Sequence, residues 1–203
     1  MWAWAHAYLC QPHPALGRRG PVCPYVPASI DGGRFHVASY RGPGDARAVH
    51  RAIDECLLIL LEASTPGQLK TSAPSPLKAS TPGPHAAGRE VSPVHTTVLL
   101  TFPYLPLDDA CALVEDVQRA AKTSLARRGL MIGEFHPGPP PAPGLHNPLF
   151  RPFDCPAPLL ALRHMLAADE PFMRDHPDHR AAYDHHFPSA GDRRRSDRTG
   201  VPA

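Results

Sequence analysis

Side chains able to do chemistry gather in one stretch of the sequence, directly after an apolar run typical of a strand. Carboxylate, imidazole, amide and guanidinium groups all occur there, on Glu134, His136, His146, Asn147 and Arg151. A neutral imidazole can act as a general base near neutral pH or can ligate a metal or haem iron. A guanidinium matches planar anions such as carboxylates and phosphates. We therefore predict that one pocket is built around this stretch.

Glu134, His136 and His146 are the predicted catalytic residues. Glu134 and His136 are two positions apart, so on a strand both side chains point to the same face, where a carboxylate can orient an imidazole. His146 lies in a loop, the usual location for ligand contacts. The structural alternatives are that His136 hydrogen-bonds a loop carbonyl at the strand exit and that Glu134 forms a surface ion pair with an arginine.

Arg151, Arg163, His164 and Asn147 are the predicted substrate-binding residues. The two arginines could bind an anionic group, with structural ion pairs as the alternative. Arg163 and His164 are adjacent, so on a strand they face opposite sides and only one of them can reach the pocket. Asn147 precedes a proline, where an Asx-type turn is the alternative.

The five cysteines are odd in number and scattered, with no CxxC pair. This pattern predicts no disulfide framework and a reducing, cytoplasmic setting. Cys23, followed by Pro24, is a candidate thiolate ligand for haem, with a buried hydrophobic cysteine as the alternative. His136 is the other candidate haem ligand. The late histidines have no metal-binding spacing and are typical of a solvated surface; they are His176, His179, His185 and His186.

The composition limits the class of protein. The chain has 203 residues, 42% of them apolar, which is enough for one domain with a real core. With 27 prolines among its 203 residues, the chain has well over the usual proline share of roughly 5%, which excludes an all-helical bundle. A net charge of +2 gives no electrostatic signature for nucleic acid. No apolar run approaches the roughly 20 residues that span a bilayer, and the start is not typical of a signal peptide.

Hydrophobic periodicity predicts the main elements. Amphipathic helices are expected at about 45–63 and from 108 to 128, and a short terminal helix at 178–187. The predicted strands are 34–40, 94–102, 130–135 and 159–166, the last of which fits either period and is assigned as a strand because two prolines precede it. The pair 94–102 and 130–135 should run parallel, joined by the second helix.

These elements predict an α+β fold, a small two-layer sandwich with a ferredoxin-like β-α-β core and long proline-rich loops. Residues 1–20 are expected to be a flexible arm, and 21–187 a single domain. Within it, the Ser/Thr/Pro/Gly-rich segment 64–92 is expected to be a disordered loop. The basic tail 188–203 is also expected to be disordered.

A set of short segments is spread over residues 22–173. They are Cys23–Val26, Phe102-Pro103, Gly129–Pro137, Gly144–Asn147, Phe150–Pro152, Leu162–Met165, Asp169 and Phe172. This set resembles the motifs of an uncharacterised bacterial family that we associate with actinomycetes and with small-molecule biosynthesis. The resemblance implies no known activity.

The layout of the chain is also similar to that of haem-dependent N-oxygenases that hydroxylate guanidines. It shares an early Cys-Pro segment, a central strand-helix-strand and a late loop with histidine and an aromatic-X-Pro turn. This likeness implies haem as the cofactor. Two functions follow: an enzyme of bacterial secondary metabolism that modifies a small anionic metabolite, or a non-catalytic ligand-binding or accessory protein. A homodimer is compatible with either, and nucleic acid and membrane are not expected as partners.

Overall fold

The computed structural model describes residues 1–62, 77–80, 92–140, 147 and 150–188. The predicted disordered segment 64–92 therefore lies outside the described residues apart from 77–80 and 92. The predicted disordered tail does so apart from Pro188.

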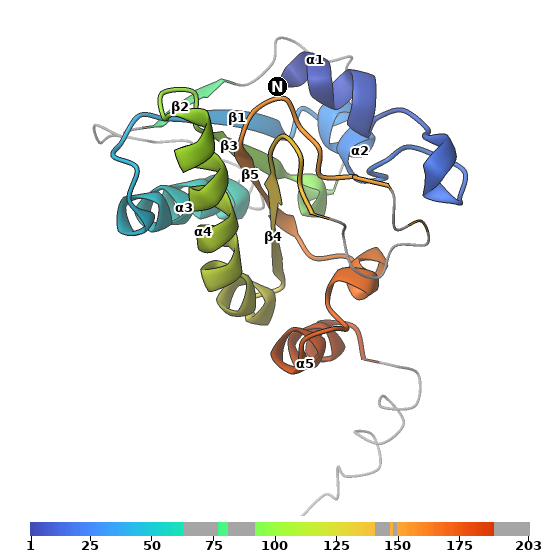
Figure 1. The fold of residues 1–203 in the computed structure, drawn as a ribbon. Helices are drawn as coiled ribbons and strands as arrows, with labels where there is room; N and C mark the ends of the chain where they lie inside the picture. The colour runs from blue at the N-terminus through green and yellow to red at the C-terminus, as the bar shows by residue number, and fades with distance from the viewer. Residues whose placement is uncertain (63–76, 81–91, 141–146, 148–149, 189–203) are drawn as a thin grey trace, which may run out of the picture.

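One mixed, five-stranded sheet forms the centre of the structure (Figure 1). Its strands are β1 (Phe35–Tyr40), β2 (Leu77–Ser80), β3 (Thr97–Thr101), β4 (Leu130–Phe135) and β5 (Leu159–His164). The strand order is β2-β1-β3-β5-β4, with β1 and β3 paired in parallel and all other neighbours antiparallel. Every residue of β3 is buried, because this central strand is covered on both faces.

Two long helices, α3 (Ala46–Glu62) and α4 (Leu107–Arg127), cover one face of the sheet (Figure 1). Both were predicted from their apolar stripes. The carboxylate of Asp45 accepts a hydrogen bond from the Ala48 N–H at 2.8 Å, which caps the first turn of α3. Helix α4 ends before Gly129, whose φ of 72° is the left-handed conformation that glycine adopts easily.

The N-terminal segment packs on the other face of the sheet. It forms α1 (Trp2–Trp4), η1 (Ala5–Leu9), η2 (Pro14–Leu16) and α2 (Val26–Asp31). Ala5 is 0% exposed and Leu9 is 4% exposed, within a cluster that includes Phe35 of β1. The sequence predicted a flexible arm here; the structure instead has helical turns, because the second face of the sheet needs an apolar cover.

The C-terminal elements close one end of the molecule. After β5 come η4 (Ala167–Phe172) and α5 (Pro177–His186), which pack against the end of α4 and against Met131 of β4. A short turn, η3 (Pro93–His95), precedes β3. The tyrosine hydroxyl of Tyr183 in α5 donates to the carbonyl of Ala167 at 2.7 Å, which ties the last helix to η4.

The predicted α+β sandwich is confirmed. Strands β3 and β4 run in the same direction around α4, as expected, and β5 lies between them in a split β-α-β arrangement. The direct parallel pair of β1 and β3, joined through α3, is a feature that the ferredoxin-like prediction did not include. The predicted terminal helix is α5, and the ambiguous segment 159–166 contains strand β5.

Candidate functional site

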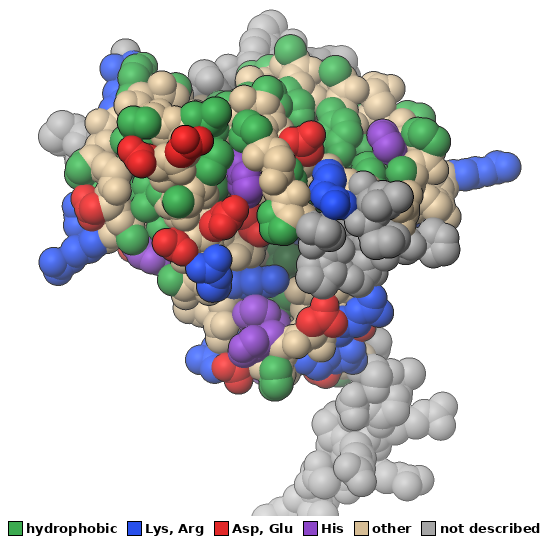
Figure 2. Space-filling view, viewed as in Figure 1, with side chains coloured by type: hydrophobic (Ala, Val, Ile, Leu, Met, Phe, Trp, Pro, Cys, Tyr) green, Lys and Arg blue, Asp and Glu red, His purple; other side chains and the backbone are tan. Residues whose placement is uncertain are grey.

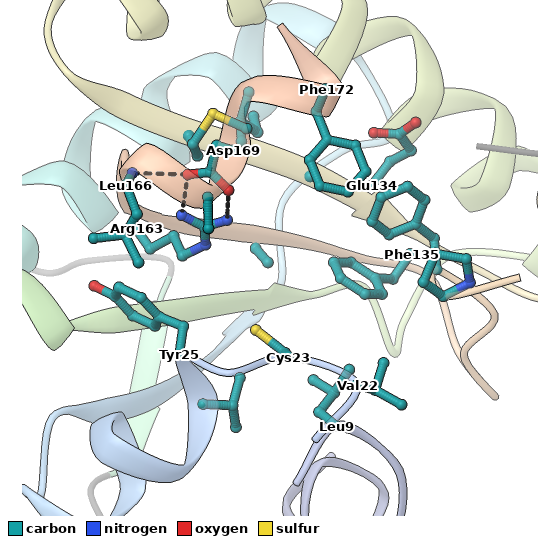
Figure 3. Close-up of a pocket in the computed structure, with 18 of the residues that line it drawn as sticks. Leu9, Val22, Cys23, Tyr25, Glu134, Phe135, Arg163, Leu166, Asp169 and Phe172 are labelled. Carbon is teal, nitrogen blue, oxygen red and sulfur yellow. Dashed lines mark hydrogen bonds and ion pairs between the residues drawn. The ribbon is translucent and has the colours of Figure 1, made fainter. Parts of the chain in front are cut away.

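A cavity of about 550 Å³ lies on the face of the sheet that the N-terminal segment covers. Most of the side chains around it are apolar, and they include Leu9, Val22, Leu99, Phe135, Leu166 and Phe172. Figure 3 shows Tyr25 and Arg163 at one end of this cavity and Glu134 and Phe135 at the other. The space-filling view shows a hollow in the surface above the histidine side chains that gather over α5 (Figure 2).

Small residues on neighbouring strands make room for the cavity. In the sheet register Ala161 of β5 lies between Leu99 of β3 and Gly133 of β4, and all three line the cavity. A Cβ atom at Gly133 would come within 3.3 Å of the Phe135 ring. Because Gly133 has no side chain and Ala161 has only a methyl group, the sheet leaves open space above these two residues.

A buried ion pair forms one end of the cavity. The guanidinium of Arg163 donates two hydrogen bonds to the Asp169 carboxylate, at 2.7 and 2.6 Å. Asp169 also accepts from the Leu166 N–H at 2.8 Å, so the carboxylate is fixed by both partners (Figure 3). The ring of Tyr25 lies 5.1 Å from the guanidinium carbon, a cation–π contact. The positive charge of Arg163 is thus matched within the protein.

Tyr25 is held in place through its hydroxyl, which donates to the backbone carbonyls of Val94 and Thr96. Burial raises the pKa of this tyrosine well above its ordinary value, and the nearby charge of Arg163 opposes the increase. Tyr25 therefore stays neutral and acts as a fixed aromatic wall.

Cys23 is a free thiol on the cavity wall that the N-terminal segment provides. Its backbone N–H donates to the Leu9 carbonyl at 2.9 Å, which ties two parts of the N-terminal segment together. Figure 3 shows the sulfur pointing into the cavity. Of the two predicted haem ligands, Cys23 is the one that reaches this space.

The opposite rim of the cavity carries charged groups from β4 and α4. Glu134 and Lys122 both line it. Burial raises the pKa of the Glu134 carboxyl, opposed by the ammonium group of Lys122; burial lowers the pKa of Lys122, opposed by Glu134 and Asp175. His176 and His179 complete this rim with ring centroids 4.5 Å apart.

His136 lies away from the cavity, beneath the exit of β4. It is 3% exposed, and its Nε2 atom lies 3.1 Å from the Glu115 carboxylate of α4, although the two groups are not aligned as a hydrogen bond. Its backbone pairs with Phe153 and Cys155 on the following loop. The structural role that was weighed for His136, closing the strand exit, agrees with these contacts.

Two other predicted residues, Asn147 and Arg151, line a second, more open hollow of about 740 Å³. The Asn147 carbonyl accepts from the Phe150 N–H at 3.1 Å, and the Arg151 carbonyl accepts from the Tyr8 hydroxyl at 3.0 Å. His146 lies outside the described residues. Burial lowers the pKa of His164, the remaining candidate, which sits on the other side of β5 from Arg163.

The structure therefore brings Cys23, Arg163 and Glu134 to one cavity and places His136, His164, Asn147 and Arg151 elsewhere. Sequence reasoning missed three residues that line this cavity and one that contacts His136, namely Tyr25, Thr97 and Lys122, and Glu115. Thr97 had a readable signal, since it is a polar residue within the most apolar strand of the chain. Lys122 had another, since it is the one lysine outside the segment 64–92.

Among the described residues, no three histidines, cysteines or carboxylates form a group that could hold a metal ion. No described helix is both long and apolar enough to cross a membrane.

Comparison with known proteins places the chain in one family. The sequence matches the family described as a domain of unknown function (DUF6875) over residues 1–75 and 84–198, nearly its full length. No curated protein and no solved structure matches it.

Proposed function

The chain belongs to the DUF6875 family, whose description gives no activity, and we propose from the site itself that the cavity binds a small, largely apolar molecule. We propose further that the chain modifies this molecule as a cytoplasmic enzyme of bacterial secondary metabolism, in line with the actinomycete proteins that its motifs resemble. The observation that carries the proposal is the cavity itself. It has the size and apolar lining of small-molecule sites, with a few polar groups at defined places.

The electrostatics at the Arg163 end of the cavity favour a neutral ligand group over the anionic group that the arginines suggested. Arg163 is matched by Asp169 through two hydrogen bonds, so it has no net charge to offer. Taking an anion from water into this apolar space would leave it without compensation at that end. Lys122, at the other rim, already lies near Glu134 and Asp175.

The reactive group that the cavity offers is the thiol of Cys23. Its sulfur faces the apolar space between Tyr25 and Phe135, where a bound molecule would lie (Figure 3). In this proposal Cys23 acts on the ligand directly or through a cofactor, and the aromatic walls exclude water from the contact.

A haem-dependent oxygenase is the most specific form of this proposal. Cys23 would hold the haem iron through its thiolate, because its sulfur reaches the cavity. His136 does not fit that role, because its ring lies against Glu115 of α4. A thiolate-bound haem would supply oxygen activation, and the residues of this chain would hold the substrate beside it.

A second candidate is a non-catalytic ligand-binding protein. It is favoured by the pairing of the polar groups with one another: Arg163 with Asp169, and the Tyr25 hydroxyl with two backbone carbonyls. Groups held in this way shape and orient a ligand without exchanging protons with it. The two candidates share the same cavity and differ in whether Cys23 is needed for turnover.

Filling the cavity tests the shared part of both candidates. Nile red, a neutral dye that fluoresces in apolar surroundings, should bind the wild-type protein. Ala161→Leu should weaken this binding by at least tenfold, because the added atoms occupy the floor of the cavity. The matched control is Ala112→Leu on the exposed side of α4. Equal binding by both variants would show that the dye and the cavity are unrelated.

The role of Cys23 needs a separate measurement. Protein purified from haem-supplemented cells is examined by absorption spectroscopy, with Cys23→Ala compared with Cys111→Ala, a half-buried thiol on α4. A stoichiometric Soret band that shifts only in Cys23→Ala supports the haem enzyme. A colourless, folded wild-type protein that also fails to take up haemin excludes this form and leaves the cofactor-free enzyme and the binding protein.

A further inference from the structure

A buried hydroxyl with no partner faces the cavity. Thr97 of β3 is 2% exposed and lines the cavity, and its Oγ1 atom makes no hydrogen bond within the part of the chain that the structure describes. The neighbouring threonines differ. Thr101, which lies further along β3 on the same face, donates to the Ala38 carbonyl at 3.0 Å. Thr96 donates to the Pro93 carbonyl at 2.8 Å. Only the threonine that faces the cavity lacks a partner among these three.

An unpaired buried hydroxyl destabilises a fold, because the group loses its hydrogen bonds to water and gains none in return. Valine has nearly the same shape and would fill this position without that cost. A threonine here is therefore unfavourable for folding alone, and a ligand that accepts its hydrogen bond would explain the residue.

The surroundings of Thr97 define what the ligand can present. Its partner across the sheet is Arg163 of β5, whose guanidinium is bound to Asp169 and to the His164 carbonyl. Because this end of the cavity has no unmatched charge, a charged ligand group would be poorly compensated. A neutral carbonyl or hydroxyl oxygen needs one hydrogen bond, which the Thr97 hydroxyl can donate.

We propose that Thr97 is a ligand-binding residue and that the ligand carries a neutral oxygen on an otherwise apolar, flat body. The oxygen accepts a hydrogen bond from Thr97 Oγ1. The apolar body lies over Ala161 and Gly133, with the rings of Phe135 and Phe172 beside it. This inference rests on the proposed function, since it names the ligand class for the same cavity.

Three naphthalenes with one substituent each test the inference. They are 2-acetylnaphthalene, with a neutral carbonyl, 2-ethylnaphthalene, with none, and 2-naphthoate, with an anionic group. Isothermal titration calorimetry on the wild-type protein should give the ketone the lowest Kd, about three- to tenfold below that of the ethyl compound, as expected for one net hydrogen bond. The anion should bind most weakly.

Substitution of the hydroxyl should remove that preference. In Thr97→Val the ketone and the ethyl compound should bind equally well, whereas Thr97→Ser should keep the preference and Thr101→Val should leave all three affinities unchanged. Thermal unfolding gives a second, independent measurement. Thr97→Val should raise Tm or leave it unchanged, and Thr101→Val should lower Tm, because its hydroxyl has a partner.

The possible failures can be told apart. If Thr97→Val keeps the preference for the ketone, or lowers Tm as Thr101→Val does, the hydroxyl has no role in binding and the inference is overturned. The proposed function survives that result if Ala161→Leu still blocks all three compounds. If the wild-type protein binds neither Nile red nor any naphthalene, the proposed function fails, and the inference fails with it.

Discussion

Arg163 on β5 and Asp169 on η4 form a two-fold hydrogen-bonded ion pair that joins the sheet to the C-terminal segment at one end of the cavity. The side chains are 19% and 5% exposed, so water screens them little. The Asp169 carboxylate also caps the turn that starts η4, through the Leu166 N–H. This ion pair therefore holds one wall of the cavity in place and leaves that wall without net charge.

Removing one member of this pair should be strongly destabilising. Asp169→Ala leaves a buried guanidinium without its carboxylate, and we expect a loss of roughly 3–5 kcal/mol in the free energy of unfolding, measured by urea denaturation. Arg163→Met/Asp169→Leu should recover most of that loss, because neither charge remains. The control is Asp184→Ala, which breaks an exposed pair with Arg180 and should lower the free energy of unfolding far less than Asp169→Ala does. A loss for Asp169→Ala as small as the control's would contradict the assignment.

Glu134 should make the stability depend on pH. Burial raises the pKa of its carboxyl in the folded protein above the ordinary value of 4.5, so the folded state holds this proton more tightly than the unfolded chain. The stabilising contribution is complete at low pH and is lost as the pH rises through the folded pKa. Glu134→Gln should therefore gain stability relative to the wild type between pH 4.5 and neutral pH.

Urea denaturation at several pH values across this range measures the difference between Glu134→Gln and the wild type. Asp116→Asn is the control, since Asp116 is 70% exposed in its pair with Arg119 and should give a difference that hardly changes with pH. A flat difference for Glu134→Gln as well would mean that water solvates the carboxylate in the folded protein.

The sequence predicted those elements whose signal is local. Helix α3 begins after Asp45 and α4 ends before Gly129, as the capping and glycine signals indicate. Helix α2 was not predicted, because prolines normally interrupt a helix. Pro27 instead occupies its first turn, where the missing N–H costs no helical hydrogen bond. The place of β5 between β3 and β4 depends on distant pairing, which periodicity does not reveal.

The candidate site was predicted in part, for a related reason. The sequence singled out Cys23, Glu134 and Arg163, and all three line the cavity. It grouped His136 with them because Glu134 and His136 lie at the end of the same strand. Strand geometry placed His136 on the same side as Glu134, but only the fold shows that α4 covers that position with Glu115. Thr97 is visible in the sequence as a polar residue within an apolar strand, but only the tertiary structure shows that it lines the cavity.

Leu9 tests whether the N-terminal segment is part of the fold. It is 4% exposed in the cluster that covers the sheet, so Leu9→Ala should cost about 2–5 kcal/mol of unfolding free energy. Leu58→Ala on α3 is the control, because Leu58 is 56% exposed and the change should cost less than about 0.5 kcal/mol. Both tryptophans of the chain, Trp2 and Trp4, lie in this segment, so their fluorescence reports its unfolding directly. A flexible arm would give no difference between the variants.

His136 separates a structural role from a catalytic one. The ring is 3% exposed and contacts Glu115, while the backbone pairing of residue 136 with the loop does not depend on the side chain. His136→Ala should therefore lower the free energy of unfolding by about 1–3 kcal/mol and leave the affinity for Nile red unchanged. His185→Ala, an exposed histidine of α5, should change neither quantity. If His136→Ala keeps wild-type stability but loses ligand binding or turnover, His136 has a binding or catalytic role instead of a structural one.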